Sequence, residues 1–262
     1  MTKILAVANQ KGGVGKTTTS VNIAASLAAA RRRVLLVDID PQGNATMGSG
    51  VNKMNLQYST YEVLMGEKTI PEVVINCTES NFDLLPSNAD LTGAEVALLD
   101  ELAREVRLRT ALDQVKANYE FIFIDCPPAL NMLTVNALVA ATAVIIPMQC
   151  EYYALEGLTA LLNSIEKIRK YLNPDLKIEG LLRTMYDPRN NLANQVSAQL
   201  LEHFGEKVYR TIIPRNVRLA EAPSHGLPVI KYDKSSRGAI AYLALAGEML
   251  RREKLTAVTQ EH

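Results

Sequence analysis

The sequence has few cysteines and no long apolar run, and these absences narrow the kind of protein it encodes. Its three cysteines, Cys77, Cys126 and Cys150, are odd in number and lack the spacing of a metal site, which favours buried thiols in a reducing cytosol. No apolar run approaches the roughly 20 residues of a membrane helix. Residues 1–10 also lack the anatomy of a signal peptide. We therefore expect a cytoplasmic protein that does not enter the membrane.

The chain also lacks net charge, because 28 basic and 28 acidic side chains cancel. No global basic field therefore indicates a nucleic-acid partner. The charge is uneven, however: residues 183–237 contain nine Lys or Arg and five Asp or Glu, a local net charge of +4. Since helix-turn-helix, zinc-finger and aromatic stacking motifs are missing, any DNA contact by this stretch is expected to be with phosphates.

The length of 262 residues and the apolar content of 48% are compatible with one large soluble α/β domain. No internal repeat or low-complexity stretch divides the chain. We expect a single domain over residues 1–254 and a flexible tail over residues 255–262.

Short apolar runs alternate with helical stretches, which predicts a mostly parallel, twisted sheet with helices on both faces. Ligands of such folds bind at the carboxyl ends of the strands. The expected strands are residues 3–8, 33–38, 82–85, 120–125, 143–147, 177–185 and 208–213. The expected helices are residues 17–30, 58–74 (several short ones), 92–115, 155–172, 192–204 and 238–252, with loops at 40–44 and 214–236.

Residues 11–18 read Lys-Gly-Gly-Val-Gly-Lys-Thr-Thr and lie between the first strand and the first helix. The strict phosphate-loop pattern places a glycine four residues before Gly-Lys-Ser/Thr, where this chain has Gln10, and the pair Gly12-Gly13 replaces it. Glycines let the backbone fold around phosphate oxygens at a helix N-terminus. The alternative is a glycine-rich turn of a Rossmann-like domain with solvated lysines.

In a phosphate-binding loop, Lys16 would meet the β- and γ-phosphates and the Thr17 hydroxyl would ligate Mg²⁺. We therefore predict ATP and Mg²⁺ as cofactors. The residues expected to hold the nucleotide in this loop are Lys11, Gly12, Gly13, Val14, Gly15, Lys16, Thr17 and Thr18.

Three acids follow predicted strands. Asp125 ends an apolar strand and is placed to hold Mg²⁺ through water; its alternative role is to cap the turn before Pro127. Asp40 is expected beside the γ-phosphate, where it could orient the attacking water. Asp38 is expected only to support its strand end.

The motif at residues 11–18 resembles the deviant Walker A motif of the ParA/MinD ATPases. Residues 37–46 resemble the second motif of that family, and residues 122–128 its Walker B motif. Residues 213–226 are similar to the ParA/Soj chromosome-partition branch. The matches run from Lys3 to about Arg252, so the resemblance covers nearly the whole chain and implies a P-loop NTPase fold.

The resemblance implies a slow, partner-stimulated ATPase that forms a homodimer when it holds ATP. Lys11 would then cross to the phosphates of the partner subunit, Lys16 would serve its own, and Asp40 would position water. Thr17 and Asp125 would handle Mg²⁺. Pro214 and Asn216 would lie near the adenine.

The resemblance also implies binding to non-specific double-stranded DNA by the ATP dimer, a ParB-type centromere-binding partner and association with the nucleoid. Arg189 and Arg218 match the DNA-contacting positions of Soj-like proteins. Further candidates for DNA contact in the same basic stretch are Arg215, Lys231, Lys234 and Arg237.

Three other functions are compatible with such a fold. A MinD-like membrane-surface ATPase needs a basic amphipathic C-terminal helix, whereas residues 253–262 hold one lysine and two glutamates. A redox enzyme like the nitrogenase iron protein needs paired cluster cysteines, and this chain has no such arrangement. A metabolic ligase like dethiobiotin synthetase needs a small-molecule pocket, on which the sequence is silent.

Overall fold

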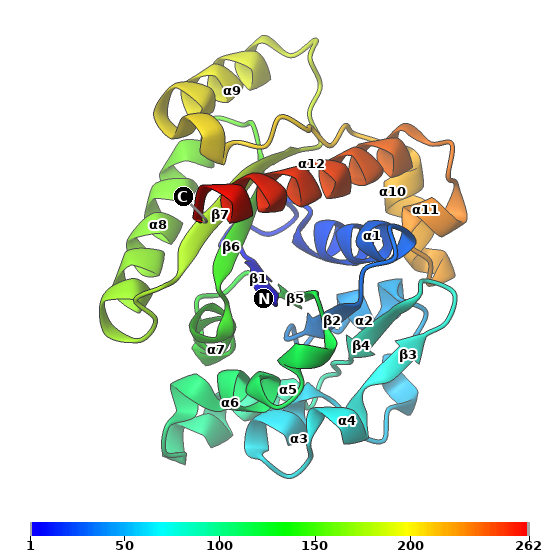
Figure 1. Cartoon of the computed structure of the whole chain (residues 1–262), viewed down its shortest axis with the longest axis vertical. Helices are drawn as coiled ribbons and strands as arrows, with labels where there is room; N and C mark the ends of the chain where they lie inside the picture. The colour runs from blue at the N-terminus through cyan, green and yellow to red at the C-terminus, as the bar shows by residue number, and fades with distance from the viewer. Residues whose placement is uncertain (1, 261–262) are drawn as a thin grey trace.

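The structure is a computed structural model that describes residues 2–260, with residues 256–260 described in their backbone only. A seven-stranded sheet has the order β3-β4-β2-β5-β1-β6-β7 (Figure 1). Neighbouring strands are parallel except β3 and β4, which are antiparallel. The mostly parallel α/β sheet of a P-loop fold, predicted from the alternating pattern, is confirmed.

The strands are β1 Lys3–Val7, β2 Val34–Asp38, β3 Ile75–Cys77, β4 Phe82–Leu85, β5 Phe121–Asp125, β6 Ala143–Gln149 and β7 Lys177–Thr184. The α-helices of the described part are α1 Lys16–Ala29, α2 Asn44–Gly48, α3 Thr60–Met65, α4 Ile70–Val73, α5 Leu91–Ala97, α6 Arg107–Asp113, α7 Met132–Ala140, α8 Ala154–Tyr171, α9 Asn191–Phe204, α10 Val217–Glu221, α11 Val229–Tyr232 and α12 Arg237–Gln260.

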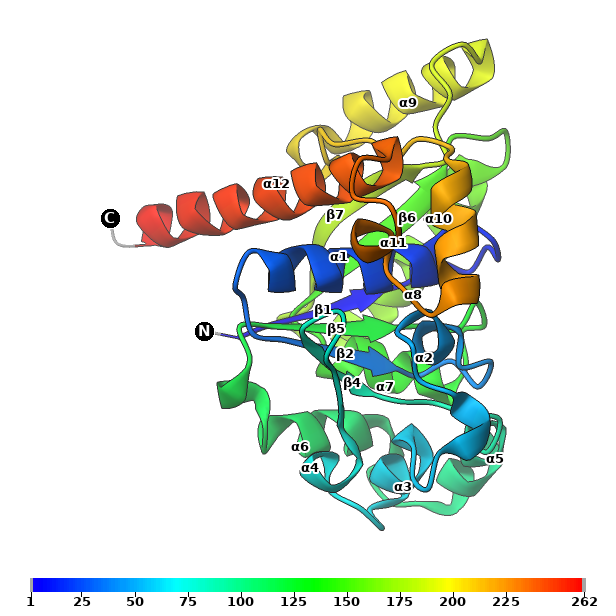
Figure 2. The ribbon, with the colours of Figure 1, turned by 90° about the vertical axis from the view of Figure 1, so that its right-hand side faces the viewer.

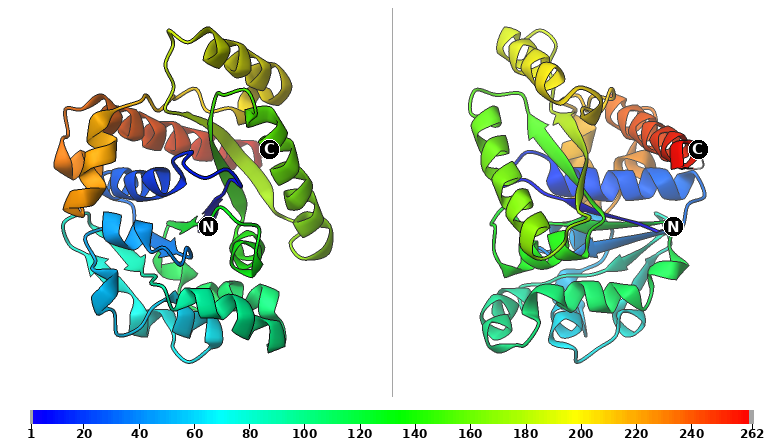
Figure 3. Two further views of the ribbon diagram at one scale, coloured as in Figure 1. Left: turned by 180° about the vertical axis from the view of Figure 1, so that it is seen from behind. Right: turned by 60° about the vertical axis from the view of Figure 1, so that its left-hand side comes forward.

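The central strands send alternate side chains to two separate cores, because successive residues of a strand point to opposite faces. In β1, Leu5 and Val7 join the core under α1 and α12, whereas Ile4 and Ala6 join the core under α7 and α8. Figure 3 shows the sheet between these two helical layers. Burial on both faces explains why the strand sequences are almost continuously apolar.

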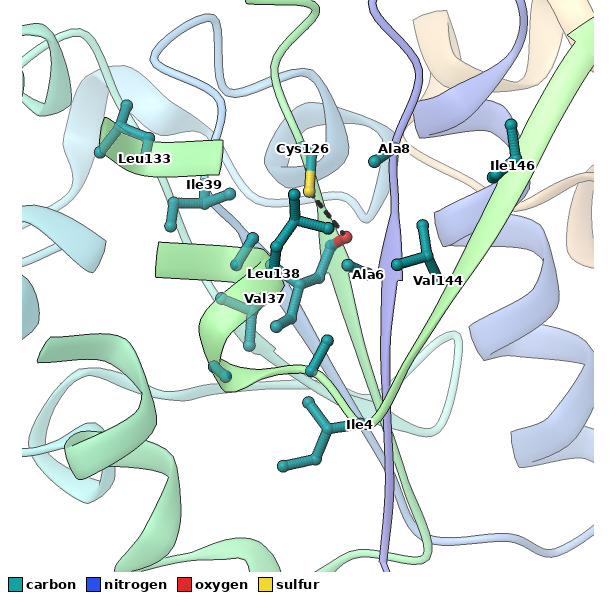
Figure 4. Packing of buried hydrophobic residues seen from close by; sticks show 14 of the residues in the cluster. Ile4, Ala6, Ala8, Val37, Ile39, Cys126, Leu133, Leu138, Val144 and Ile146 are labelled. Atoms are coloured by element: carbon teal, nitrogen blue, oxygen red, sulfur yellow. Dashed lines mark hydrogen bonds between the residues drawn. The ribbon is translucent and has the colours of Figure 1, made fainter. Parts of the chain in front are cut away.

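The core on the α7 side surrounds Cys126 (Figure 4). Its thiol lies 3.7 Å from the carbonyl oxygen of Ile124, and burial raises its pKa, with the charge of Asp125 acting in the same direction. Cys77 and Cys150 are also free, buried thiols. All three cysteines therefore pack as the sequence suggested, in reduced form.

The strand predicted over residues 208–213 is wrong. This segment lies beside β7: Val208 forms an isolated bridge with Leu181, and the amides of Tyr209 and Ile213 donate to the carbonyls of Leu181 and Arg183, at 3.0 and 2.9 Å. Between them, the amides of Arg210 and Thr211 donate to the carboxylate of Glu248 on α12, at 2.9 and 2.8 Å. A side chain from a distant helix thus interrupts the strand ladder.

Several other boundaries differ from the prediction. The helix expected over residues 92–115 is interrupted, because Glu101 is extended and Ala103 has a left-handed φ of 54°. Strand β3 and helix α7 were not expected, and the loop at 214–236 contains α10 and α11. The last helix continues to Gln260, past its predicted end at Arg252. The flexible tail over residues 255–262 stays a prediction, since residues 261 and 262 lie outside the described part.

Candidate functional site

The glycine-rich loop lies at the carboxyl edge of the sheet, between β1 and α1, where the strand arrows in Figure 2 end. Asn9 fixes its beginning: the side-chain amide donates to the Pro147 carbonyl at 2.8 Å, and the side-chain oxygen accepts from the Lys11 amide at 3.0 Å. Gly13 and Gly15 have φ of 72° and 86°, a left-handed conformation that glycine adopts without strain. Gly15 is also the N-cap of α1.

Seven consecutive amides of this loop have no hydrogen-bond acceptor in the described part of the chain. From Gly12 to Thr18, no backbone N–H donates a hydrogen bond to a residue in the described part of the chain, and the ladder of α1 begins at the Thr19 amide. Unpaired amides beside a helix N-terminus attract anions by their partial positive charge. The loop can therefore surround a phosphate group with donors.

The two lysines of the loop point in different directions. Lys16 is 7% exposed, and its Nζ donates to the Lys11 carbonyl at 3.1 Å. Burial lowers the pKa of Lys16, and the charge of Asp125 acts against that lowering. Lys11 instead reaches Glu151, just beyond β6, with 2.5 Å between Nζ and Oε2 and both side chains about half exposed. Lys16 therefore serves its own loop, whereas Lys11 lies at the surface.

Asp125 ends β5 and is fully buried. Its carboxylate accepts hydrogen bonds from the hydroxyls of Thr17 and Ser20, both at 2.7 Å. Burial raises the pKa of Asp125, and these two hydroxyls oppose the rise. The arrangement brings together Thr17 and Asp125, the two residues for which a role at Mg²⁺ is predicted.

Asp38 lies next to Asp125 in the register of β2 and β5. It accepts the amide and the hydroxyl of Thr46, each at 2.8 Å, and is fully buried. Burial, and after it the charge of Asp125, raises the pKa of Asp38. Because its oxygens are occupied by the loop after β2, its position agrees with a supporting role.

Asp40 is 7% exposed, and both its carboxylate and its backbone carbonyl accept hydrogen bonds. Its carboxylate accepts from the Gln42 amide at 2.9 Å, and its backbone carbonyl accepts from the Ser87 hydroxyl at 2.8 Å. Its charge acts on both Lys16 and Asp125. Hydrogen bonds therefore fix the Asp40 carboxylate, and its charge acts on groups of the phosphate loop.

The two residues proposed for the adenine lie on the chain after the 208–213 segment. Pro214 forms an isolated bridge with Tyr186, two residues beyond the end of β7. Asn216 caps α10, since its side-chain oxygen accepts from the amides of Arg218 and Leu219. Both residues thus lie near the carboxyl edge of β7, and α10 is seen at that edge in Figure 2.

The predicted DNA-contacting cations are exposed, and two of them have acidic partners. Arg189 forms a bidentate ion pair with Asp187, in which Nε and Nη2 donate to the two carboxylate oxygens at 2.9 and 2.8 Å. Arg218 lies 2.8 Å from Glu221 and 3.4 Å from Asp233. The other candidates form no ion pair within the described part of the chain; these are Arg215, Lys231, Lys234 and Arg237.

Comparison with known proteins settles the family. A family model described as an AAA domain matches residues 2–178. The chain is 55% identical over 249 residues to the sporulation initiation inhibitor protein Soj of Bacillus subtilis, covering 95% of this chain and 98% of that protein. It is 50% identical over 254 residues to the chromosome partitioning protein ParA of Caulobacter vibrioides, covering 96% and 95%. The chain belongs to the ParA/Soj family of partitioning ATPases.

A solved structure of the same fold supports the cofactors of this ParA/Soj protein. Cobyrinic acid a,c-diamide synthase from Mycobacterium smegmatis, with bound ADP and magnesium, matches with a TM-score of 0.85 and 40% identity, covering 97% of this chain and 96% of that one. The ParA/Soj chain is an ATPase that uses ATP and Mg²⁺. Its free amides, its buried lysine and its Thr17–Asp125 pair fit these cofactors.

Among the described residues, no group of three or more His, Cys, Asp and Glu side chains could hold a metal ion. Mg²⁺ commonly takes one or two protein ligands together with nucleotide phosphates and water. No helix in the same part of the chain is long and apolar enough to cross a membrane.

Sequence reasoning missed several polar residues of the site. Glu151 pairs with Lys11, Ser20 holds Asp125, and Thr46 holds Asp38. The one signal in the sequence for Glu151 was its place after a predicted strand, which puts it at the carboxyl edge of the sheet. Ser20 and Thr46 sit within helices, where a hydroxyl is ordinary and gives no sign of its partner.

Proposed function

We propose that this ParA/Soj ATPase is an ATP-dependent dimeric switch that binds non-specific double-stranded DNA on the nucleoid. Slow hydrolysis, stimulated by a ParB-type partner, would drive chromosome or plasmid partitioning. The observation that carries the proposal is the divergence of Lys11 from Lys16. A lysine of the phosphate loop that lies at the surface, 2.5 Å from Glu151, is available to a second subunit.

Within one subunit, the amides of residues 12–18 and the Lys16 ammonium bind the phosphates of ATP. The Thr17 hydroxyl and Asp125, 2.7 Å apart, are the proposed holders of Mg²⁺, Thr17 directly and Asp125 through water. When bound, Mg²⁺ neutralises charge that develops on the β- and γ-phosphates. The proposed adenine contacts are Pro214 and Asn216.

The hydrolytic step needs a positioned water and positive charge. Asp40, fixed by its bonds to Gln42 and Ser87, is proposed to orient the attacking water. Lys11 is proposed to leave Glu151 and cross to the phosphates of the partner subunit. Positive charge supplied there stabilises the transition state as an arginine finger does. A monomer is then a poor catalyst because this charge is missing.

DNA binding is proposed to be through phosphates, by Arg189, Arg218 and their neighbours in the basic stretch. The exposure of these cations supports contacts that are independent of sequence and sensitive to salt. A dimer doubles the number of such contacts, which gives a physical reason for DNA binding to depend on ATP.

The deciding experiment combines Lys11→Ala with an exposed control, Lys167→Ala on α8. ATP affinity is measured by calorimetry, and dimer formation with ATP by analytical ultracentrifugation. We expect Lys11→Ala to bind ATP almost normally but to fail to dimerise and to hydrolyse, while Lys167→Ala behaves like the wild type. Normal ATP-dependent dimers of Lys11→Ala would refute the cross-subunit role.

A gel shift on non-specific DNA with ATP, ADP and no nucleotide tests the switch itself. A shift with ATP alone is expected. Affinity for DNA that is indifferent to nucleotide would overturn the switch, and ATP-dependent binding to anionic vesicles instead of DNA would favour the MinD-like alternative.

A further inference from the structure

Thr184 connects the end of β7 to the phosphate loop. It is the last residue of the strand and is 2% exposed. Its hydroxyl donates to the backbone carbonyl of Val14 at 2.7 Å. None of the motifs of the sequence includes this residue, and the hydrolytic scheme above does not use it.

The Val14 carbonyl belongs to the same peptide unit as the Gly15 amide. In a planar trans peptide, the C=O and the following N–H point in opposite directions. A donor that holds the Val14 carbonyl therefore turns the Gly15 N–H to the opposite side. Gly15 is one of the loop residues whose amide has no acceptor in the described part of the chain.

The orientation of this peptide unit needs an external support, because glycine rotates freely. Gly15 has a φ of 86°, and glycine loses more conformational freedom than any other residue when it is fixed. Val14 is 1% exposed, and its burial anchors one end of the unit. Thr184 fixes its carbonyl.

Thr184 is itself rigid. It pairs with Gln149 in the register of β6 and β7, and a β-branched side chain has few rotamers. Its methyl carbon would lie 3.8 Å from a Cβ placed on Gly15, which is ordinary van der Waals distance. The side chain thus faces this peptide unit with its methyl group as well as its hydroxyl.

We propose that Thr184 is a positioning residue for the nucleotide: by holding the Val14 carbonyl, it aims the Gly15 amide at a phosphate of bound ATP. The inference concerns the ATP site only and does not depend on dimerisation or on DNA. It predicts that the Thr184 hydroxyl matters for nucleotide affinity and not merely for stability.

The test compares Thr184→Val, which keeps the shape and loses the hydroxyl, with Thr184→Ser, which keeps the hydroxyl. Affinity of the full chain for MgATP and MgADP is measured by calorimetry, and thermal unfolding is measured without nucleotide. We expect Thr184→Val to raise both dissociation constants roughly tenfold, the usual effect of leaving one buried acceptor without a partner. Thr184→Ser should bind within about twofold of the wild type.

Thr142→Val is the control, because the Thr142 hydroxyl also donates to a backbone carbonyl, that of Ile4, at 2.9 Å. It lies at the opposite edge of the sheet, so this change should leave nucleotide affinity unchanged. Thr184→Val with wild-type affinities, even at a lower unfolding temperature, would overturn the proposal and leave Thr184 a purely structural residue.

Should Thr184→Val fail to fold, Thr184→Ala and Thr184→Ser provide the comparison, since they differ only in the hydroxyl. An affinity for MgATP that is weaker in the alanine variant supports the assignment. Equal affinities in the two variants refute it.

Discussion

Lys11 and Glu151 form an ion pair at the carboxyl edge of the sheet, with 2.5 Å between Nζ and Oε2. The pair draws one loop lysine outward, while Lys16 bonds to the backbone of the loop itself. Any approach of Lys11 to a second subunit must break the pair. Glu151 is therefore a competitor for the residue on which the proposed dimer depends.

Removing this competitor should favour the dimer. Glu151→Gln keeps the size of the side chain and loses its charge. An exposed ion pair contributes up to about 1 kcal/mol, so we expect ATP-dependent dimerisation at roughly two- to fivefold lower protein concentration. Sedimentation with ATP measures this, with Glu166→Gln, whose carboxylate pairs with Arg169, as the control. A dimer that forms less readily in Glu151→Gln would show that Glu151 has another role.

Lys16→Ala should lose nucleotide binding. Lys16 is 7% exposed and its ammonium bonds to the Lys11 carbonyl of the phosphate loop, so its removal leaves a bound phosphate without its main counter-charge. We expect the dissociation constant for MgATP to rise roughly 100-fold or more. Calorimetry measures the affinity, and thermal unfolding without ATP confirms the fold. Retained tight binding would mean that the loop does not hold the phosphates.

Asp125→Asn should weaken the use of Mg²⁺ in hydrolysis while leaving metal-free ATP binding nearly unchanged. The amide keeps the shape of the side chain but presents no negative charge beside Thr17. We expect hydrolysis at saturating ATP to fall at least roughly tenfold, because a positioned metal is worth several kcal/mol to the transition state. The binding of ATP in EDTA should change little. A variant that needs no more Mg²⁺ than the wild type for half-maximal hydrolysis would exclude Asp125 as a holder of the metal.

The positions of the acids at the strand ends could be predicted because an apolar run that ends in an acid indicates both a buried strand and the edge at which the acid lies. A buried parallel strand is an apolar run, and an acid that ends it must lie at the edge where the other strands end. Asp38 and Asp125 accordingly lie beside each other in the register of β2 and β5. No contact between distant segments was needed to place them.

The segment at residues 208–213 could not be predicted in this way. Its sequence, Val-Tyr-Arg-Thr-Ile-Ile, is rich in residues that favour strands, but the Glu248 carboxylate accepts hydrogen bonds from two of its amides. The bond joins residues nearly 40 positions apart, and a single glutamate in an amphipathic helix gives no sign of it. Thr184 and Glu151 were missed for the same reason, since each acts on a loop far from it in sequence.

Glu248 should contribute to stability in a pH-dependent manner. Burial acts to raise its pKa, but the hydrogen bonds from Thr211 and Arg210 outweigh burial and leave the pKa below its usual value. Glu248→Gln should therefore lower the free energy of unfolding by about 1–3 kcal/mol near pH 7. Urea unfolding measures the change, with the exposed Glu206→Gln as the control.

The sign of the pH effect follows from the lowered pKa. The carboxylate of Glu248 stabilises the fold above the pKa of an unfolded glutamate, and this contribution is lost as the pH falls through the lower pKa of the folded state. The difference between the wild type and Glu248→Gln should therefore narrow in acid. A difference that grows on acidification would contradict the hydrogen-bonded carboxylate.

Arg218→Glu should separate DNA binding from dimerisation. Arg218 is exposed on α10 and must leave Glu221 and Asp233 to reach a phosphate. Reversing its charge should weaken affinity for non-specific DNA at least roughly tenfold. It should also flatten the slope of log affinity against log salt by about 0.9 for each phosphate that the variant no longer neutralises. ATP-dependent dimers should persist, because α10 is not part of the phosphate loop. Arg109→Glu, an exposed change on α6, should leave both properties unchanged. DNA affinity that survives Arg218→Glu with its full salt slope would remove α10 from the proposed interface and leave the loop of Arg189 as the place to look.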